Sequence, residues 1–210
     1  RVQGDEDPGG IVRQQTMWPI IQGGIHNELR LRSLDGILSR ADWTGVAIGG
    51  LSVGEPKPTM HRVLELLEPR LPSERPRYLM GVGFPEDLIH GIARGVDLFD
   101  CVAATRNGRH GTAWITDGKV NVRKAAFRTS DEPLDAECDC RCCTTVSRGY
   151  LRHLFVVQDM LALRLVSLHN IRFLIRLAET ARAHVLSGTY ASWSASWLAR
   201  YHGDRTRTTD

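Results

Sequence analysis

The residues most able to do chemistry lie in the stretch Gly95–Arg109, whose sequence is GVDLFDCVAATRNGR. We predict an apolar strand over Val96–Val102 that runs into a polar, basic loop, which is where α/β enzymes place catalytic groups. Two acids, Asp97 and Asp100, interrupt the apolar run. Because successive side chains of a strand point to opposite faces, at most one of the two acids points into a cleft. Asp100 is the candidate, since it lies at the end of the strand.

Two arginines, Arg106 and Arg109, follow Asp100 closely. A carboxylate in this place can attack a sugar carbon, while guanidinium groups just beyond it hold the phosphates of an anionic polymer. The plainer alternative is that Asp100 caps a loop and pairs with Arg106. The pattern alone leaves both alternatives open.

A second group of reactive side chains is the run CDCRCC at residues 138–143. Thiolates at this spacing suit a metal ion better than a disulfide framework, and structural zinc takes four thiolate or imidazole ligands. His153, His169 and His184 follow, and each could complete the shell. The spacing does not choose the histidine or the spare cysteine, and four reduced thiols without metal are the alternative. A closed shell has no open position, so we expect a structural metal.

Composition sets the class of protein. The chain has 210 residues, of which 42% are hydrophobic, and this is enough for a packed core. A formal net charge of +3 permits an RNA partner without requiring one. No segment has the length of a membrane span, no signal peptide is apparent, and the clustered thiols favour a reducing compartment. We expect a cytoplasmic protein without a membrane partner and, because the chain begins with Arg1, the C-terminal part of a longer one.

The elements that would position these groups alternate between strand and helix. We predict strands over 17–21, 46–48, 77–82 and 96–102, separated by helices over 27–41, 58–71 and 85–94. Four alternations indicate a parallel sheet with right-handed crossovers, which would be half of an eight-stranded barrel. Beyond them we predict a hairpin with its turn at Asp117-Gly118, then helices over 147–163, 166–187 and 189–201.

Four motifs in one order give the chain a close resemblance to the tRNA-guanine transglycosylases, also called queuine tRNA-ribosyltransferases. They are GGLSVGE at 49–55, YLMGVG at 78–83, GVDLFDCV with the following TR at 95–106, and the cysteines with a later histidine. The resemblance runs from about Trp18 to Tyr201. It implies an α/β fold, the C-terminal half of a (β/α)8 TIM barrel with an inserted zinc-binding subdomain and C-terminal helices. The expected parts are barrel units at 1–111, hairpin and zinc subdomain at 112–165, helices at 166–202 and a disordered tail at 203–210.

The resemblance also implies an activity. Family members exchange guanine at the wobble position of tRNA for a 7-deazaguanine base in queuosine biosynthesis, without breaking the RNA backbone. Asp100 matches the nucleophile that forms a covalent intermediate with the ribose. Val53 resembles the bacterial branch, which takes 7-aminomethyl-7-deazaguanine. We therefore expect a pentosyltransferase whose partners are tRNA and the base.

Further positions match the family's binding residues. Those expected to bind the base are Gln22, Gly50, Leu51, Met80 and Gly81. Those expected to grip the RNA are Arg106 and Arg109. The zinc pattern of the family falls on Cys138, Cys140, Cys143 and His169, which implies one structural zinc ion per chain. Cys142 is extra, as a free thiol or an alternative ligand. Related enzymes are homodimers, and Tyr150 and His153 match their interface, although an intramolecular core is the alternative.

The chain departs from the family pattern in two places. Ala103-Ala104 replaces a proline before Thr105, which predicts a looser basic loop. The proton-transferring aspartate and a second base-reading aspartate would lie before Arg1, so we expect the 210-residue chain alone to be inactive. The alternatives are a non-catalytic zinc-containing partner subunit, an inactive fragment, a zinc-containing RNA-binding module, and a sugar-phosphate enzyme on a similar barrel.

Overall fold

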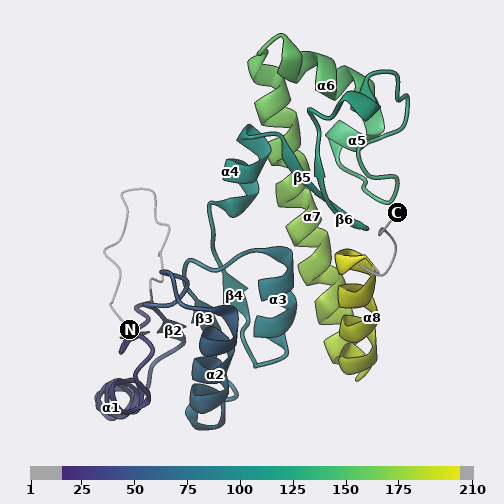
Figure 1. The fold of residues 1–210 in the computed structure, drawn as a ribbon. Coiled ribbons are helices and arrows are strands. Elements are labelled where there is room, and N and C mark those ends of the chain that lie inside the picture. The colour runs from purple at the N-terminus through teal and green to yellow at the C-terminus, as the bar shows by residue number, and fades with distance from the viewer. Residues whose placement is uncertain (1–15, 204–210) are drawn as a thin grey trace, which may run out of the picture. The chain divides into compact units, whose positions relative to one another are not determined.

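The computed structural model describes residues 16–203 (Figure 1). Residues 1–15, whose polar sequence predicts a loop, and the predicted tail after residue 203 lie outside this part. The chain divides into two compact units, and neither is one uninterrupted stretch. The first unit comprises Arg1–Val82 and His90–Cys101, and the second comprises Gly83–Ile89 and Val102–Asp210. The domain boundaries expected from the sequence stay predictions.

The first unit is built on a parallel sheet with the strand order β1-β2-β3-β4. Its strands are β1 (Ile20–Ile21), β2 (Val46–Ile48), β3 (Arg77–Leu79) and β4 (Leu98–Phe99). The helices that alternate with them are α1 (Asn27–Leu38), α2 (Lys57–Leu67) and α3 (Pro85–Ile92), the last of which spans the division between the units. The predicted alternation and the predicted parallel sheet are both confirmed. Three of the four strands are shorter than the apolar runs from which they were predicted.

Helix α2 shows how the sequence builds this core. Met60, Val63, Leu64 and Leu67 recur at helical spacing and are all buried against the sheet. The helix ends earlier than predicted, at Leu67, and a 3-10 turn follows over Glu68–Arg70. Proline at position 69 explains this early end, because it has no N–H to continue the α-helical hydrogen bonds.

The second unit is organised around one long helix, α7 (Met160–Leu186), which Figure 1 shows running beside the hairpin. It contacts α4 (Ala103–Arg109), α5 (Arg141–Thr145), α6 (Arg148–Val156), α8 (Tyr190–His202) and β5 (Thr112–Ile115). Strand β5 pairs antiparallel with β6 (Gly118–Asn121), which confirms the predicted hairpin, but its two-residue turn is Thr116-Asp117, one residue earlier than predicted. A 3-10 turn occupies Ala125–Phe127. Within residues 16–203, no helix combines the length and the apolar character needed to cross a bilayer.

Two further sequence expectations about the second unit are wrong. The basic stretch after β4 is not a loop but helix α4, in which Ala103 and Ala104 are buried. Alanine at these positions suits a regular helix, and the looser basic segment expected from the missing proline stays a prediction. The break between α6 and α7 also lies earlier than the predicted break between helices over 147–163 and 166–187. Gln158 adopts a left-handed conformation with φ of 60°, and the Asp159 side chain caps α7 by accepting a hydrogen bond from the Leu161 N–H.

Candidate functional site

The ends of the four parallel strands bring most of the predicted site residues together. Gln22 follows β1, Gly50 and Leu51 follow β2, Met80 and Gly81 follow β3, and Asp100 follows β4. Because neighbouring parallel strands end at the same edge of a sheet, these segments lie side by side within the first unit. We call this group of six residues the strand-end site.

Asp100 is held by one of its two carboxylate oxygens. Its Oδ1 accepts hydrogen bonds from the Gly81 N–H at 2.7 Å and from the Tyr78 hydroxyl at 2.8 Å. The hydrogen bond to Asp100, and then burial, raise the pKa of Tyr78 above its usual value of 10. Among the described residues, the other oxygen of Asp100 has no partner, and the side chain is exposed. The carboxylate is therefore oriented and still open to a ligand.

Asp97 lies at the opposite end of β4. Its carboxylate accepts the Arg77 N–H at 2.8 Å, and its own N–H donates to the Arg77 carbonyl at 2.9 Å. These bonds join the beginnings of strands β3 and β4. The two acids of the sequence motif thus have different surroundings, one at each end of a short strand.

The side chain of Gln22 lies against the backbone that follows β2. A Cβ atom added to Gly49 would be 2.7 Å from Gln22 Nε2, and one added to Gly50 would be 2.7 Å from Gln22 Oε1. Gly50 also has φ of 63°, a conformation that side chains disfavour. A side chain at either position would displace the amide of Gln22 from the main chain, so glycine at both positions allows this close approach.

The segment after Gly50 contains both paired and unpaired N–H groups. The carboxylate of Glu55 accepts the N–H groups of Ser52 and Val53, the latter at 3.0 Å. Burial alone would raise the pKa of Glu55, but these backbone hydrogen bonds outweigh it and lower the pKa below its usual range. Within residues 16–203, the N–H groups of Gly50 and Leu51 have no partner. Two donors therefore remain available at this strand end.

Sequence reasoning missed Arg30, which lies directly beneath the strand-end site. This arginine of α1 is fully buried, and its guanidinium group donates to four main-chain carbonyls around the ends of β1 and β2. The sequence did contain a signal. Arg30 is spaced by four and seven residues from Leu34 and Ile37, so helical periodicity puts it on the buried face of α1.

The predicted RNA-binding arginines belong to the second unit. Arg106 and Arg109 lie one turn apart on α4 and are both exposed. The opposite face of α4 packs on α7 so closely that a Cβ atom at Gly108 would be 2.7 Å from the backbone of Ser167. This packing directs the two guanidinium groups away from α7, on one face of the helix.

The predicted metal ligands also come together. Cys138, Cys140, Cys143 and His169 are buried, and their ligand atoms all lie within 4.8 Å of one another. The tetrahedral geometry of zinc places two thiolate sulfurs about 3.8 Å apart, so the cluster has the right size. We call these four residues the Cys–His cluster. His153 and His184, the other histidines considered, are not part of it.

The imidazole of His169 is oriented for a ligand role. Its Nε2 donates to the Trp114 carbonyl at 2.6 Å, which leaves Nδ1 facing the sulfurs of Cys143 at 3.2 Å and Cys140 at 3.6 Å. A second hydrogen bond of this kind commonly fixes the orientation of metal-binding histidines. Burial alone would lower the pKa of His169, but hydrogen bonds to Cys138 and Cys140 raise it to about 9.

The thiols share protons unevenly. Hydrogen bonds from neighbouring thiols, with Cys138 first, lower the pKa of Cys140, whereas contact with Cys138 and then Cys140 raises the pKa of Cys143. Contact with Cys140 raises the pKa of Cys142 to about 12. The donor set of three sulfurs and an imidazole nitrogen fits zinc, which binds thiolates in place of their protons. Cys142 is fully buried beside the cluster but outside the set of four.

An ion-pair network fastens the loop that carries these cysteines to α7. Arg172 of α7 donates to both carboxylate oxygens of Asp139, at 2.8 and 2.7 Å, and also pairs with Glu179 at 3.1 Å. Asp139 lies between two cysteines of the cluster. Because these side chains are exposed, the pairs fix geometry more than they add stability.

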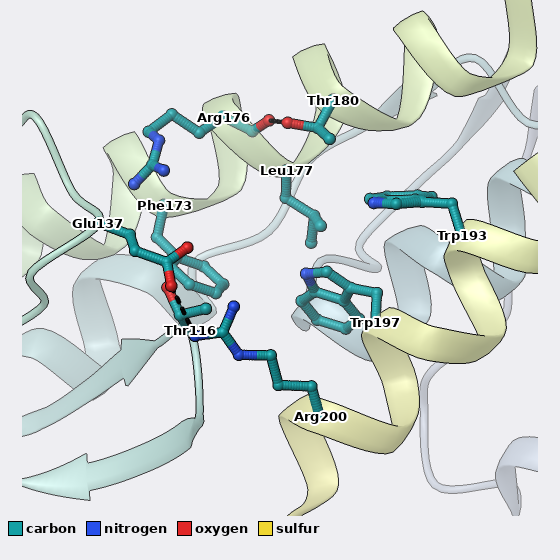
Figure 2. A pocket seen from close by; sticks show the side chains of 9 residues that line it. All are labelled: Thr116, Glu137, Phe173, Arg176, Leu177, Thr180, Trp193, Trp197 and Arg200. Carbon is teal, nitrogen blue, oxygen red and sulfur yellow. Dashed lines mark hydrogen bonds and ion pairs between the residues drawn. The ribbon is translucent and has the colours of Figure 1, made fainter. Parts of the chain in front are cut away.

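Figure 2 shows a pocket of about 210 Å³ in the second unit, between α7 and α8. Trp193 and Trp197 line one side of it and Phe173 the other. Arg200 of α8 reaches across and pairs with Glu137, and it also pairs with Asp117 at 2.7 Å. These ion pairs tie α8 to the hairpin turn and to the segment before the cysteines, so the pocket is a feature of helix packing.

The comparison with known proteins agrees with the geometry. The family model described as "Queuine tRNA-ribosyltransferase" matches residues 6–203. Curated proteins of that name include one from Herpetosiphon aurantiacus, 51% identical over 187 residues, which are 89% of this chain and 47% of the relative. Another, from Symbiobacterium thermophilum, is 50% identical over 189 residues, which are 90% of this chain and 47% of the relative. The chain thus spans about half the length of the curated relatives that it matches.

Proposed function

This chain belongs to the queuine tRNA-ribosyltransferase family, and we propose that it supplies the nucleophile-bearing half of a tRNA-guanine transglycosylase. The reaction exchanges guanine at the wobble position of tRNA for 7-aminomethyl-7-deazaguanine. One observation carries the proposal. The Asp100 carboxylate is held on one oxygen by Gly81 and Tyr78, its other oxygen is free, and it ends a strand beside unpaired main-chain donors.

The free oxygen of Asp100 attacks the anomeric carbon of the ribose, and the bond from that carbon to the base breaks. The bonding electrons leave with guanine, which takes up a proton from an acid supplied outside this chain. The carboxylate is then an ester of the sugar. A ring nitrogen of the incoming base attacks the same carbon and gives its proton to the conjugate base of that external acid, while the ester bond breaks and releases Asp100 as the carboxylate. Two inversions give overall retention at the sugar, as in retaining glycosidases.

The strand-end site is suited to hold the base beside Asp100. Guanine presents a carbonyl oxygen and a ring nitrogen as acceptors, and the N–H groups of Gly50 and Leu51 are unpaired donors. The amide of Gln22 lies next to them and offers both a donor and an acceptor. Met80 is half-buried and contributes a wall. The side chain of Leu51 packs in the core, so its role is confined to its main chain.

The second unit would bind the RNA. Arg106 and Arg109 present two cations on one exposed helix face, which suits neighbouring phosphates. One zinc ion in the Cys–His cluster would fix the surrounding loop, because all four ligand positions are filled by protein. The aromatic face of α6 at Tyr150 and His153 would join two chains in a homodimer, and the protein would act in the cytoplasm.

We also propose that the parallel sheet is half of a (β/α)8 barrel. Its strands follow one another in sequence order, as in a barrel, and relatives have about twice the length of the matched region. By "the completed enzyme" we mean this chain joined to the part of a relative that it does not cover. The chain alone would exchange no guanine, because the proton-transferring acid is outside it.

The test is the exchange of radiolabelled guanine into tRNA by the completed enzyme, with a denaturing gel to detect the covalent adduct. Asp100→Asn is expected to lose both exchange and adduct by at least about 1,000-fold, because an amide cannot serve as the nucleophile. Asp97→Asn is the matched control, at the other end of the same strand, and keeps the adduct. Normal exchange by Asp100→Asn would refute the proposed mechanism.

A further inference from the structure

We propose that Arg30 is a positioning residue, which aims the N–H groups of Gly50 and Leu51 toward the base. This inference rests on the proposed function, because it assumes that a base occupies the strand-end site. It assigns a role to a residue that makes no contact with the reacting atoms. The supporting observations are the burial of the side chain, its four carbonyl partners, and the geometry of the peptide group.

The guanidinium group of Arg30 is fully buried and joins the two strand ends. Its Nη1 donates to the carbonyls of Ile21 at 3.0 Å and Gly49 at 2.7 Å. Its Nη2 donates to the Gly50 carbonyl at 3.1 Å, and its Nε donates to the Gly24 carbonyl at 2.7 Å. Two of these carbonyls follow β2 and the others flank the end of β1, so one side chain fixes both segments.

Peptide planarity converts these contacts into a direction for the neighbouring donors. In a trans peptide the C=O of one residue and the N–H of the next point in opposite directions. The carbonyl of Gly49 points to Arg30, so the N–H of Gly50 points away from it. The carbonyl of Gly50 also points to Arg30, which turns the N–H of Leu51 away in the same manner. These are the two N–H groups that have no partner within residues 16–203.

Glu55 anchors the other side of the same loop. It takes up the next two N–H groups, those of Ser52 and Val53. The two free donors therefore lie between a cation that holds carbonyls and an anion that holds amides. Burial lowers the pKa of Arg30, and the negative charge of Glu55 acts in the opposite direction. Arg30 therefore holds the carbonyl groups of this loop, and Glu55 holds its N–H groups.

Lysine is a poor substitute for this arginine. Its planar fork carries five N–H donors, whereas lysine offers three donors from a single atom. Gly50 has φ of 63°, so its conformation is one of several that glycine adopts readily. Without the guanidinium group, the peptides on either side of Gly50 are free to rotate. The base would then meet carbonyl oxygens where it requires N–H donors.

Arg77 provides a matched control in the same unit. It is also buried and donates to the main-chain carbonyls of Leu71 at 2.8 Å and Pro72 at 3.3 Å. It begins β3, whereas the strand-end site follows the end of that strand. Its removal is expected to destabilise the fold through the same kind of lost hydrogen bonds without changing the two free donors.

The experiment measures separate KM values for guanine and for tRNA in the completed enzyme. We expect Arg30→Ala to raise the KM for guanine at least about tenfold while the KM for tRNA changes less than about twofold. Arg30→Lys, which keeps the charge, is expected to raise the KM for guanine less than Arg30→Ala does, again with little change in the KM for tRNA. Millimolar guanidinium ion is expected to restore part of the guanine affinity of Arg30→Ala. Arg77→Ala is expected to lower the melting temperature without a selective rise in the KM for guanine.

Two results separate the failure of this inference from failure of the proposed function. A wild-type completed enzyme that exchanges no guanine would overturn the proposed function and this inference with it. An active wild type would overturn this inference alone in either of two cases. In the first, the Arg30 variants leave the KM for guanine unchanged or raise both KM values equally. In the second, Arg77→Ala gives the same selective rise.

Discussion

The two sites of this chain are built in opposite ways. In the Cys–His cluster the functional atoms belong to side chains, and three of the four ligands fall within six residues of one another. At the strand-end site the donors are main-chain N–H groups, and the arginine that orients them comes from a different element, α1. Residue types therefore identify the cluster, whereas the strand-end site depends on backbone directions that residue types do not express.

The two sites also differ in what holds them together. The Cys–His cluster gathers three thiols and an imidazole within 4.8 Å of one another, and a bound cation would hold these four ligands together. The backbone of the strand-end site is held without a metal, because Arg30 binds its carbonyls, Glu55 binds two of its N–H groups and the sheet pairs its strands. We expect loss of the metal to disturb the cluster severely and the strand-end site little.

The largest effect should come from removing the histidine of the cluster. We expect His169→Ala to lose the zinc ion and to unfold the surrounding segment, because structural zinc contributes apparent binding energies of about 10–16 kcal/mol. His184→Ala, on the same helix, is the control and should keep one zinc ion per chain. Metal analysis and thermal unfolding of both variants provide the measurement. If His169→Ala keeps its zinc while Cys142→Ser loses it, the assigned ligand set is wrong.

A smaller effect should follow from loosening Asp100. We expect Tyr78→Phe to slow guanine exchange by the completed enzyme about 10- to 100-fold, since it removes one hydrogen bond to a charged group. Because the pKa of Tyr78 is raised, its hydroxyl should still donate at pH 9. Tyr190→Phe removes a hydrogen bond to the Ile89 carbonyl in the second unit and is the matched control. Equal rates for Tyr78→Phe and wild type would show that Gly81 alone orients the nucleophile.

The smallest effect concerns the surface beside the cluster. Tyr150 is 46% exposed and stacks on His153 at a ring distance of 6.5 Å. If this face joins two chains, Tyr150→Ala should weaken the dimer about tenfold or more, because exposed aromatic side chains often dominate interfaces. Sedimentation of the completed enzyme over a range of concentrations measures the effect, with Tyr150→Phe as the control. A wild type that stays monomeric at micromolar concentration would contradict the proposed dimer.

The comparison also explains which features the sequence could predict. The order of strands and helices follows from local periodicity, and the prediction of the parallel sheet was correct. Helix α4 was missed because its residues 105–109 are polar or glycine, while its helical form depends on packing against α7, more than 50 residues later. Arg30 was missed because a charged residue in a helix normally faces water. Only its spacing from Leu34 and Ile37 marked it as buried.

The path of the chain between the two units limits how this protein can evolve. The segment Gly83–Ile89 belongs to the second unit, although residues on both sides of it belong to the first. Its Phe84 packs against Trp114 at 5.9 Å, and its Glu86 pairs with Lys119 at 2.9 Å. A single genetic crossover between relatives cannot exchange one unit whole, because it leaves this short segment with the wrong parent. We therefore expect substitutions at 84 and 86 to be accompanied by substitutions at 114 and 119.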